Sequence, residues 1–359
     1  MYKNLIILLT SLCILPSCSR TKPNITVICE ENEVGNCIIK WDAPSRIRGY
    51  VRVYASLNKD LIPESTPVGL APVSAGKMVI IPNDPTKRYY YTMVFNNNIK
   101  IKVATRNINI PGIENFRDLG GYLSNDKNRE TRWGMIYRSA QIDNINPYAL
   151  SELKNIGIRT IIDLRTPEEI SNKQPLGQIR TVHVPISTGN MDRLISHIRK
   201  GEKIDSIHTI LKQMNQDLVT KYSKEYKQIF TILSDSSQYP LVIECSSGKE
   251  RTGVITALIL ASVGVDENTI MDDYELSNNY FNITESSKYA YKLPIKSQEA
   301  ITTIYSAKRE FINAAKETIE SRFGSVNAYL QKELGLKKEQ IKQLQNLFLE
   351  AEDRKCFLF

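Results

Sequence analysis

The chain has 359 residues, of which 42% are hydrophobic and 24% are charged, and its formal net charge is +8. This composition excludes a wholly disordered or collagen-like protein, and the length allows one large domain or two, each able to bury a core. The positive charges are spread along the chain without a long Lys/Arg-rich block. We therefore expect no nucleic-acid partner, and either a mild preference for anionic partners or an ordinary solvated surface.

The N-terminus has the features of an export signal. Lys3 precedes a nearly continuous apolar run at residues 5–15, which is shorter than the ~20 residues that span a bilayer and is typical of a signal-peptide core. The run ends in Leu-Pro-Ser before Cys18, an end that resembles a bacterial lipobox. We expect residues 1–18 to be a lipoprotein signal peptide, with Cys18 lipidated and the exported protein anchored to the cell envelope membrane on its periplasmic or surface side. The alternative is an ordinary secretory peptide that is cut near Ser17.

Residues 24–107 have the pattern of a series of short β-strands. Several stretches alternate polar and apolar residues, and turn clusters such as residues 82–85 and 96–98 separate them. Six or seven strands at this spacing predict a small all-β sandwich. Trp41 on an early strand and the tyrosine-rich residues 88–95 resemble a fibronectin type III or immunoglobulin-like module. We interpret this region as a spacer or docking domain.

Two cysteines flank the first predicted turn of this region. Cys29 and Cys37 lie on either side of residues 30–36, between two strand-like runs. A cross-strand disulfide is compatible with an oxidising compartment, and two buried free thiols are the alternative. The sequence leaves both open.

From residue 108 onward the pattern changes to alternating strands and helices. Strand-like runs occupy residues 158–163 and 239–243, and the last hundred residues are helical. Residues 252–263 are apolar on nearly all sides, as in a helix buried within a domain. This alternation predicts an α/β domain over residues 108–359, with a mostly parallel central sheet flanked by helices.

Two shorter helices are predicted by their first residues. Asn146-Pro147 opens one of them, and Gly157 ends it. Thr166 and Glu169 have the spacing of a capping box, in which the two residues satisfy each other's backbone donors at the start of a helix. We expect a helix after residue 166.

The candidate catalytic residues lie in segment 242–253, which has the sequence VIECSSGKERTG. We expect a strand to end at Cys245 and a helix to begin near Arg251. Between them, Gly248 permits a backbone conformation that a side chain would resist. The backbone N–H groups of such a loop can point inward and form an anion-binding nest, and the helix N-terminus adds its positive end. The candidate phosphate-binding residues are Ser246, Ser247, Gly248, Lys249, Glu250 and Arg251.

This setting favours a nucleophilic thiolate. A cysteine thiol has a pKa of ~8.5, and such a field lowers it to about 3.5–7.5, so Cys245 would be ready at neutral pH. The planar fork of Arg251 can hold two phosphate oxygens at once. The hydroxyl of Thr252 can donate to the sulfur when it leaves, which completes a two-step transfer through a phosphocysteine intermediate.

The loop resembles that of protein-tyrosine and dual-specificity phosphatases, and its Gly-Lys-x-Arg-Thr-Gly form is most similar to a bacterial tyrosine phosphatase family that includes lipid-phosphatase-like members. Further blocks that are similar to this family follow in the family's order at residues 115–121, 137–139, 162–165, 273–278 and 323–329. The resemblance covers residues 108–350. It implies an α/β phosphatase fold and phosphotyrosine or phosphoinositide-like substrates.

Two positions depart from the family's pattern. Glu244 stands where the family has a histidine before the nucleophile, and its charge would raise the pKa of the Cys245 thiol unless it points away or pairs with a cation. Glu250 stands where the family has an aspartate. A leaving alcohol needs a proton, and we expect Glu250 to supply it and Asp163 to act as a positioning group. The reverse assignment stays open, as does a purely structural role for Asp163.

We expect no metal or cofactor. The three histidines, His183, His197 and His208, are not at metal-ligand spacing, and the six cysteines include no Cys-x-x-Cys pair, whereas zinc sites cluster these residues.

The sequence therefore predicts a protein-tyrosine phosphatase that acts on phosphotyrosyl proteins. Two alternatives remain. A phosphoinositide or inositol phosphate phosphatase, with a phospholipid substrate, is suggested by the membrane anchor and by Lys249, which is either a second phosphate-binding cation or a solvated lysine at the rim. A catalytically silent phosphate-binding protein is suggested by Glu244 alone.

Overall fold

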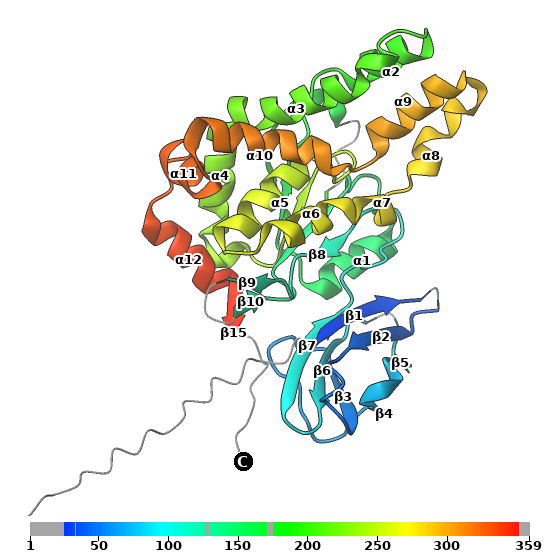
Figure 1. Cartoon of the computed structure of the whole chain (residues 1–359), viewed down its shortest axis with the longest axis vertical. Helices are drawn as coiled ribbons and strands as arrows, with labels where there is room; N and C mark the ends of the chain where they lie inside the picture. Colours follow the sequence, from blue (N-terminus) through cyan, green and yellow to red (C-terminus); the bar gives the residue numbers. More distant parts are fainter. Residues whose placement is uncertain (1–24, 33, 86, 126–128, 171–174, 352–359) are drawn as a thin grey trace, which may run out of the picture.

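The computed structural model describes residues 25–32, 34–85, 87–125, 129–170 and 175–351 (Figure 1). The expected signal peptide with its Cys18 lies outside the described residues. None of the described helices is long and apolar enough to cross a bilayer.

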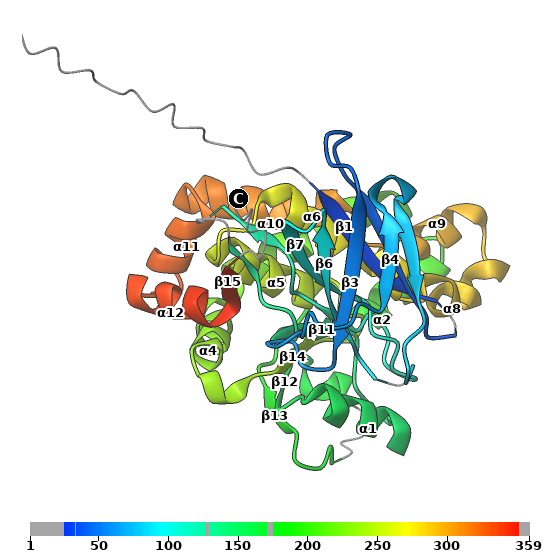
Figure 2. The ribbon, with the colours of Figure 1, turned by 90° about the horizontal axis from the view of Figure 1, so that it is seen from below.

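The first part of the chain forms two antiparallel sheets that enclose one hydrophobic core. One sheet has the strand order β1-β2-β5 (Figure 1). The other has the order β4-β3-β6-β7 (Figure 2). The strands are β1 (Thr26–Glu31), β2 (Cys37–Asp42), β3 (Tyr50–Ser56), β4 (Gly69–Pro72), β5 (Lys77–Ile80), β6 (Tyr90–Phe95) and β7 (Ile99–Ala104). The predicted series of short strands is therefore present.

Alternation of side chains along each strand builds this core. In β2, Cys37, Ile39 and Trp41 are buried while Lys40 is exposed. The Trp41 ring meets Phe95 from the other sheet edge to face, with the ring centroids 6.1 Å apart.

The two cysteines of the first hairpin are both buried and are free thiols in the structure. Cys29 pairs with Ile39 in the register of β1 and β2, so Cys37 lies diagonally across from it. A hydrogen bond to Cys37 and burial raise the pKa of the Cys29 thiol well above its usual range.

The second part of the chain is built on a five-stranded sheet with the order β13-β12-β14-β11-β8. Its strands are β8 (Arg117–Asp118), β11 (Ile136–Ser139), β12 (Thr160–Asp163), β13 (Arg180–His183) and β14 (Leu241–Glu244). The neighbours β13–β12, β12–β14 and β14–β11 are parallel, but β8 is antiparallel to β11. The sheet is therefore mixed. The described residues between β8 and β11 form the two short strands β9 and β10 and no helix, whereas a parallel pair needs a long crossover connection.

Helices cover both faces of this sheet. On one face α1 packs Leu153 against Ile161 and Val242, and on the other α5 packs Ile255 against Ile243. The helices are α1 (Pro147–Ile156), α2 (Met191–Arg199), α3 (Ile207–Lys221), α4 (Ser223–Leu233), α5 (Glu250–Ser262), α6 (Glu267–Glu275), α7 (Ser277–Tyr280), α8 (Ile283–Ser287), α9 (Ile295–Tyr305), α10 (Arg309–Phe323), α11 (Val326–Lys332) and α12 (Lys338–Phe348). A small sheet of β9 (Leu123–Ser124), β10 (Arg129–Thr131) and β15 (Leu349–Ala351) lies beside α12 (Figure 1).

The helix starts predicted from the sequence have different outcomes. Asn146 caps α1 by accepting a hydrogen bond from the Ala149 backbone N–H, and Gly157 ends that helix with a φ of 83°. After Thr166, however, the structure has only a 3-10 turn, Pro167–Glu169, in place of a longer helix. The helix stops there because the next residue, Ile170, already has an extended backbone.

One arginine of the first part is inserted into the second. Arg88, which precedes β6, pairs with the Asp118 carboxylate through Nη2 at 2.6 Å and donates to the Tyr137 hydroxyl through Nη1 at 2.6 Å. The side chain of Asp118 is fully buried, and its carboxylate also accepts the backbone N–H groups of Gly120 and Gly134. The contact therefore joins the sandwich to the turn that leads into the central sheet.

We expect Arg88→Ala to lower the free energy of unfolding by about 3–5 kcal/mol, because it leaves the buried Asp118 charge without its cation. Urea unfolding of the whole chain measures this loss, and Arg46→Ala, which removes an exposed arginine, is the matched control. A loss below about 1 kcal/mol would show that the contact contributes no more than a surface ion pair.

Candidate active site

The structure places Cys245 directly after β14, and α5 begins at Glu250 on the far side of a short loop. This phosphate loop, defined as residues 245–251, lies at the carboxyl ends of the parallel strands, where sites of α/β proteins form. Gly248 has a φ of +65°, and a Cβ there would collide with the backbone of Ser139. Only glycine fits both constraints.

Side chains beneath the loop hold its carbonyl groups outward. Arg138 donates through Nη2 to the Gly248 carbonyl at 2.7 Å, and Asn115 donates through Nδ2 to the carbonyls of Ser247 and Gly248 at 3.0 and 3.1 Å. Asp273 in turn binds Arg138 at 2.6 Å and Arg117 at 3.3 Å. Tying carbonyls to the outside favours N–H groups that point into the loop, as an anion nest requires.

The Cys245 thiol is 1% exposed, and its pKa is lowered from the usual value. Burial alone would raise the pKa, but the charge of Arg251, the Thr252 hydroxyl and the backbone N–H groups of Thr252 and Lys249 outweigh it. The Thr252 hydroxyl is buried and has no other partner among the described groups. Cys245, Arg251 and Thr252 are thus brought together as the sequence predicts.

Arg251 is held by a residue that the sequence marked only as a helix cap. Its Nη1 and Nη2 bind the two carboxylate oxygens of Glu169 at 2.6 and 2.7 Å, and Nη2 lies 3.0 Å from the Ser246 hydroxyl. Burial alone would raise the pKa of Glu169, but its contacts with Arg251, the Thr166 backbone N–H and the Ser246 hydroxyl outweigh burial and lower the pKa to about 2. No spacing rule links positions 82 residues apart, so this pair could not be predicted from the sequence.

Lys249 and Glu250 turn away from the loop into the protein. Lys249 is 2% exposed and donates to the carbonyls of Ile304 and Ser306 at 2.6 and 3.0 Å. It also lies 3.0 Å from the carboxylate of Glu250, which accepts hydrogen bonds from Tyr274 and Asn215. Lys249 is therefore not a solvated rim lysine, and in this position its charge is used to tie the loop to α9.

Asp163 and Glu244 belong to a separate cluster around Arg165. Asp163 binds the Arg165 guanidinium at 2.9 and 2.8 Å. Glu244 accepts the Ile142 backbone N–H at 2.5 Å and lies 3.8 Å from Arg165. Burial and the charge of Asp163 raise the pKa of Glu244 well above its usual range, against the opposing effects of Arg165 and the Ile142 backbone N–H.

The orientation of Glu244 follows from strand alternation. Val242 packs in the core beneath α1, whereas Ile243 and Cys245 pack in the core beneath α5. Glu244 shares the face of Val242, so it lies on the opposite side of the sheet from the nucleophile. Both conditions under which Glu244 leaves the thiolate undisturbed are met.

Asp273 and Arg117 are functional residues whose roles the sequence did not resolve. Asp273 is buried, and the charges of Arg117 and Arg138 outweigh burial and lower its pKa to about 2.

No group of three or more His, Cys, Asp or Glu side chains within the described ranges is arranged to hold a metal ion.

We expect the alkylation of Cys245 by iodoacetamide to have a pH midpoint below the ~8.5 of an ordinary thiol. In Arg251→Ala the midpoint should rise, because the charge that favours the thiolate is removed. Mass spectrometry of the Cys245 peptide measures both midpoints. An unchanged midpoint in the variant would contradict the proposed role of Arg251 in holding the thiolate.

Comparisons of the sequence with known proteins find tyrosine phosphatases. The chain is 24% identical over 284 residues to the triple specificity protein phosphatase PtpB of Mycobacterium tuberculosis, which covers 67% of this chain and 98% of that protein. It is 22% identical over 222 residues to a tyrosine-protein phosphatase of Nostoc commune, covering 58% of this chain and 71% of that protein.

Two solved structures are similar over part of the chain. One is P. aeruginosa TpbA, with 14% identity and a TM-score of 0.24, and the match covers 55% of this chain and 96% of that one. The other is the core catalytic domain of the PP-IP phosphatase SIW14 from S. cerevisiae, with 18% identity and a TM-score of 0.29, and the match covers 62% of this chain and 98% of that one. The sequence model of the tyrosine phosphatase family matches residues 108–350, so the chain belongs to this family and is a phosphoric monoester hydrolase.

Proposed function

We propose that the chain is a protein-tyrosine phosphatase that hydrolyses phosphomonoesters through a cysteinyl-phosphate intermediate, without a metal or cofactor. The observation that carries this proposal is the Cys245 thiol with its lowered pKa, set at the base of a loop whose carbonyls are tied outward. A dianionic tetrahedral group is the ligand that suits inward N–H groups and a neighbouring guanidinium.

In the first step the Cys245 thiolate attacks phosphorus, the P–S bond forms and the ester P–O bond breaks. The leaving oxygen takes its electron pair and a proton. Arg251 stabilises the charge on the transferring group. Both of its Nη atoms are bound to Glu169 in the structure, so they would have to exchange this partner for the two phosphate oxygens that the sequence predicts they hold.

In the second step water attacks phosphorus, the P–S bond breaks and inorganic phosphate leaves. The Cys245 sulfur regains the electron pair, and the buried Thr252 hydroxyl beside it stabilises the thiolate that forms. The water gives its proton to the Glu250 carboxylate, the group proposed to have protonated the leaving oxygen in the first step, as its oxygen bonds to phosphorus. Splitting the hydrolysis in this way replaces one difficult step with two easier ones.

The proton donor for the leaving oxygen stays a prediction. Glu250 lies next to Arg251, but its carboxylate accepts from Tyr274 at 3.0 Å, so it would have to exchange this partner for the substrate. Asp163 is bound by Arg165 on both oxygens and would face the same requirement. We keep Glu250 as the donor and Asp163 as a positioning group.

A phospholipid or inositol phosphate substrate is the alternative, and it loses one of its two supports. Lys249, the cation suggested for a second phosphate, donates its hydrogen bonds to the backbone carbonyls of Ile304 and Ser306. A silent phosphate-binding protein loses its support as well, since Glu244 shares the strand face of Val242, away from the thiol. Phosphotyrosine therefore remains the proposed substrate.

We expect Cys245→Ser to abolish hydrolysis of p-nitrophenyl phosphate, and Arg251→Ala to lower kcat by at least ~10²-fold, because a preorganised charge at the transition state is lost. Glu169→Gln should lower kcat less, since Arg251 is retained but less firmly held. Rates without and with a chelator measure these effects, and the chelator should change none of them.

Near-equal rates for wild type and Cys245→Ser would rule out the cysteinyl-phosphate mechanism. The same assay with phenyl phosphate, whose leaving group is poorer, identifies the proton donor. If Glu250 donates the proton, Glu250→Gln should lose more rate with phenyl phosphate than with the nitrophenyl ester. Asp163→Asn should affect both substrates equally.

We also propose that the sandwich is a fibronectin type III or immunoglobulin-like module. Its seven strands divide into the orders β1-β2-β5 and β4-β3-β6-β7, so that β5 returns to the first sheet after β3 and β4 have built the second. This crossing between two packed sheets is expected of Greek-key sandwiches of that type, and the aromatic contact between Trp41 and Phe95 in the shared core supports the proposal.

The proposed location is the envelope membrane, through lipid on Cys18. The support is the apolar run at residues 5–15 and the lipobox-like end before Cys18. We expect the wild-type protein in the membrane fraction of an expressing bacterium and Cys18→Ala in the soluble fraction or in the medium. Membrane retention of Cys18→Ala would contradict the proposal.

A further inference from the structure

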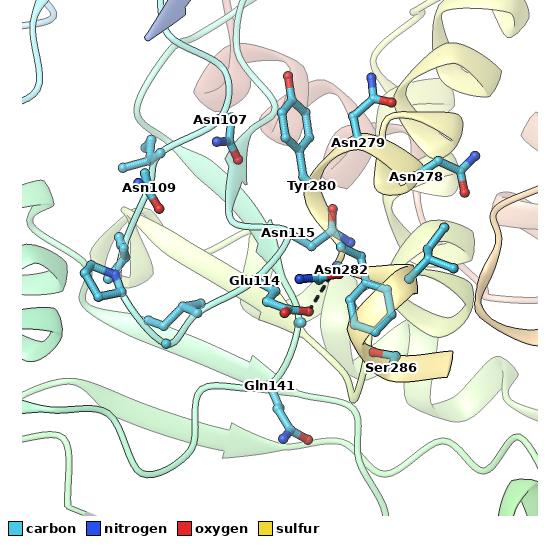
Figure 3. Close-up of a pocket in the computed structure, with 18 of the residues that line it drawn as sticks. Asn107, Asn109, Glu114, Asn115, Gln141, Asn278, Asn279, Tyr280, Asn282 and Ser286 are labelled. Carbon is cyan, nitrogen blue, oxygen red and sulfur yellow. Dashed lines mark hydrogen bonds between the residues drawn. The ribbon is translucent and has the colours of Figure 1, made fainter. Parts of the chain in front are cut away.

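A cleft of about 1080 Å³ lies beside the phosphate loop (Figure 3). One wall is the connection from β7 to β8, residues 107–115, and the other is formed by residues 278–286 of α7 and α8. Ser246, the residue after the nucleophile, also lines this cleft.

The lining of the cleft is polar but almost uncharged. Among the described lining residues Glu114 is the one ionisable acid, and there is no lysine or arginine. The carboxamides of Asn107, Asn109, Gln141 and Asn279 line the cleft (Figure 3), and none of the hydrogen bonds in the described part of the chain involves them. A carboxamide both donates and accepts hydrogen bonds, so these four groups are available to a ligand.

A short series of backbone hydrogen bonds connects Glu114 with the phosphate loop. The Ala140 backbone N–H donates to the Glu114 carbonyl at 2.9 Å, and the Gln141 N–H donates to the Ser246 carbonyl at 3.4 Å. The Ser246 hydroxyl in turn contacts Arg251 and Glu169. Because Ser246 belongs to the loop and also lines the cleft, the groups beside a phosphate held in the loop would reach the cleft at this residue.

We propose that this cleft binds the polypeptide chain that flanks the phosphotyrosine, and that Glu114 favours a basic residue in that chain. The inference rests on the proposed tyrosine phosphatase activity and names its substrate class. Carboxamides match the alternating donors and acceptors of a peptide backbone, and Ile108, Tyr280 and Phe281 offer apolar surface to its side chains.

An inositol phosphate headgroup fits this lining less well. Recognition of several phosphates uses clustered Arg and Lys, and the described lining has neither. The volume also equals or exceeds the ~300–1,000 Å³ of ordinary small-molecule pockets. A longer, largely uncharged ligand uses this space better.

The test measures binding to the Cys245→Ser protein, so that it does not depend on turnover. The ligands are a phosphotyrosyl peptide with lysines beside the phosphotyrosine, the same peptide with glutamates, free phosphotyrosine and a short-chain phosphoinositide. We expect the lysine peptide to bind at least ~10-fold more tightly than phosphotyrosine, as several new hydrogen bonds would allow, and about two- to fivefold more tightly than the glutamate peptide.

Two cleft variants and one control are combined with Cys245→Ser. Glu114→Gln should abolish the difference between the lysine and glutamate peptides, and Asn279→Ala should weaken both peptides about two- to tenfold. Neither should change the affinity for phosphotyrosine. Glu339→Gln, which neutralises an exposed acid on α12, should change nothing.

Each contrary outcome identifies what fails. Peptides that bind no better than phosphotyrosine, a peptide preference that Glu114→Gln leaves intact, or tighter binding of the phosphoinositide would overturn the inference. Hydrolysis of p-nitrophenyl phosphate by the corresponding proteins that retain Cys245 is measured in parallel. Absence of that hydrolysis, with selective peptide binding intact, would refute the proposed catalytic mechanism and leave the peptide cleft established.

Discussion

The phosphate loop depends on the buried ion pair between Asp273 and Arg138. Arg138 uses one guanidinium nitrogen for the Asp273 carboxylate and the other for the Gly248 carbonyl, at 2.6 and 2.7 Å. A buried ion pair contributes little net stability, because desolvation of both charges offsets their attraction. Its effect here is geometric. With the carboxylate holding one edge of the guanidinium, the other edge fixes a loop carbonyl outward, and the N–H groups that would bind phosphate are set before any ligand arrives.

The acids around the loop are kept apart by cations. Glu169 is paired with Arg251, whereas Asp163 and Glu244 share Arg165 on the other side of the strand. Asp143 binds Arg165 as well, so three carboxyl groups lie around this one guanidinium. Burial and the charge of Asp163 raise the pKa of Glu244 well above its usual range. The alternation of the strand turns Glu244 away from Cys245, which explains how a glutamate can stand directly before a cysteine whose thiol pKa is lowered.

Local features of the site could be predicted from the sequence, and partnerships across the chain could not. The strand before Cys245, the glycine in the loop and the helix after it are adjacent in sequence, so their geometry follows from backbone preferences. The pairs Glu169–Arg251 and Arg138–Asp273 join residues 82 and 135 positions apart, and only the folded chain brings them together. Lys249 shows the same limit, since burial against α9 decides its role. The antiparallel β8 escaped prediction because a two-residue strand has no periodicity.

The sandwich and the phosphatase region meet where the cleft begins. Arg88 donates to the Thr105 carbonyl at 3.2 Å as well as to Asp118, and residues 107–115, which follow Thr105, form one wall of the cleft. The same arginine donates to the Tyr137 hydroxyl, and Tyr137 precedes Arg138, which holds the loop. One residue of the sandwich thus contacts both the start of the cleft wall and β11, the strand that pairs with β14 and carries Arg138. A spacer would need neither contact, so the contacts favour a sandwich that is part of the framework of the active site.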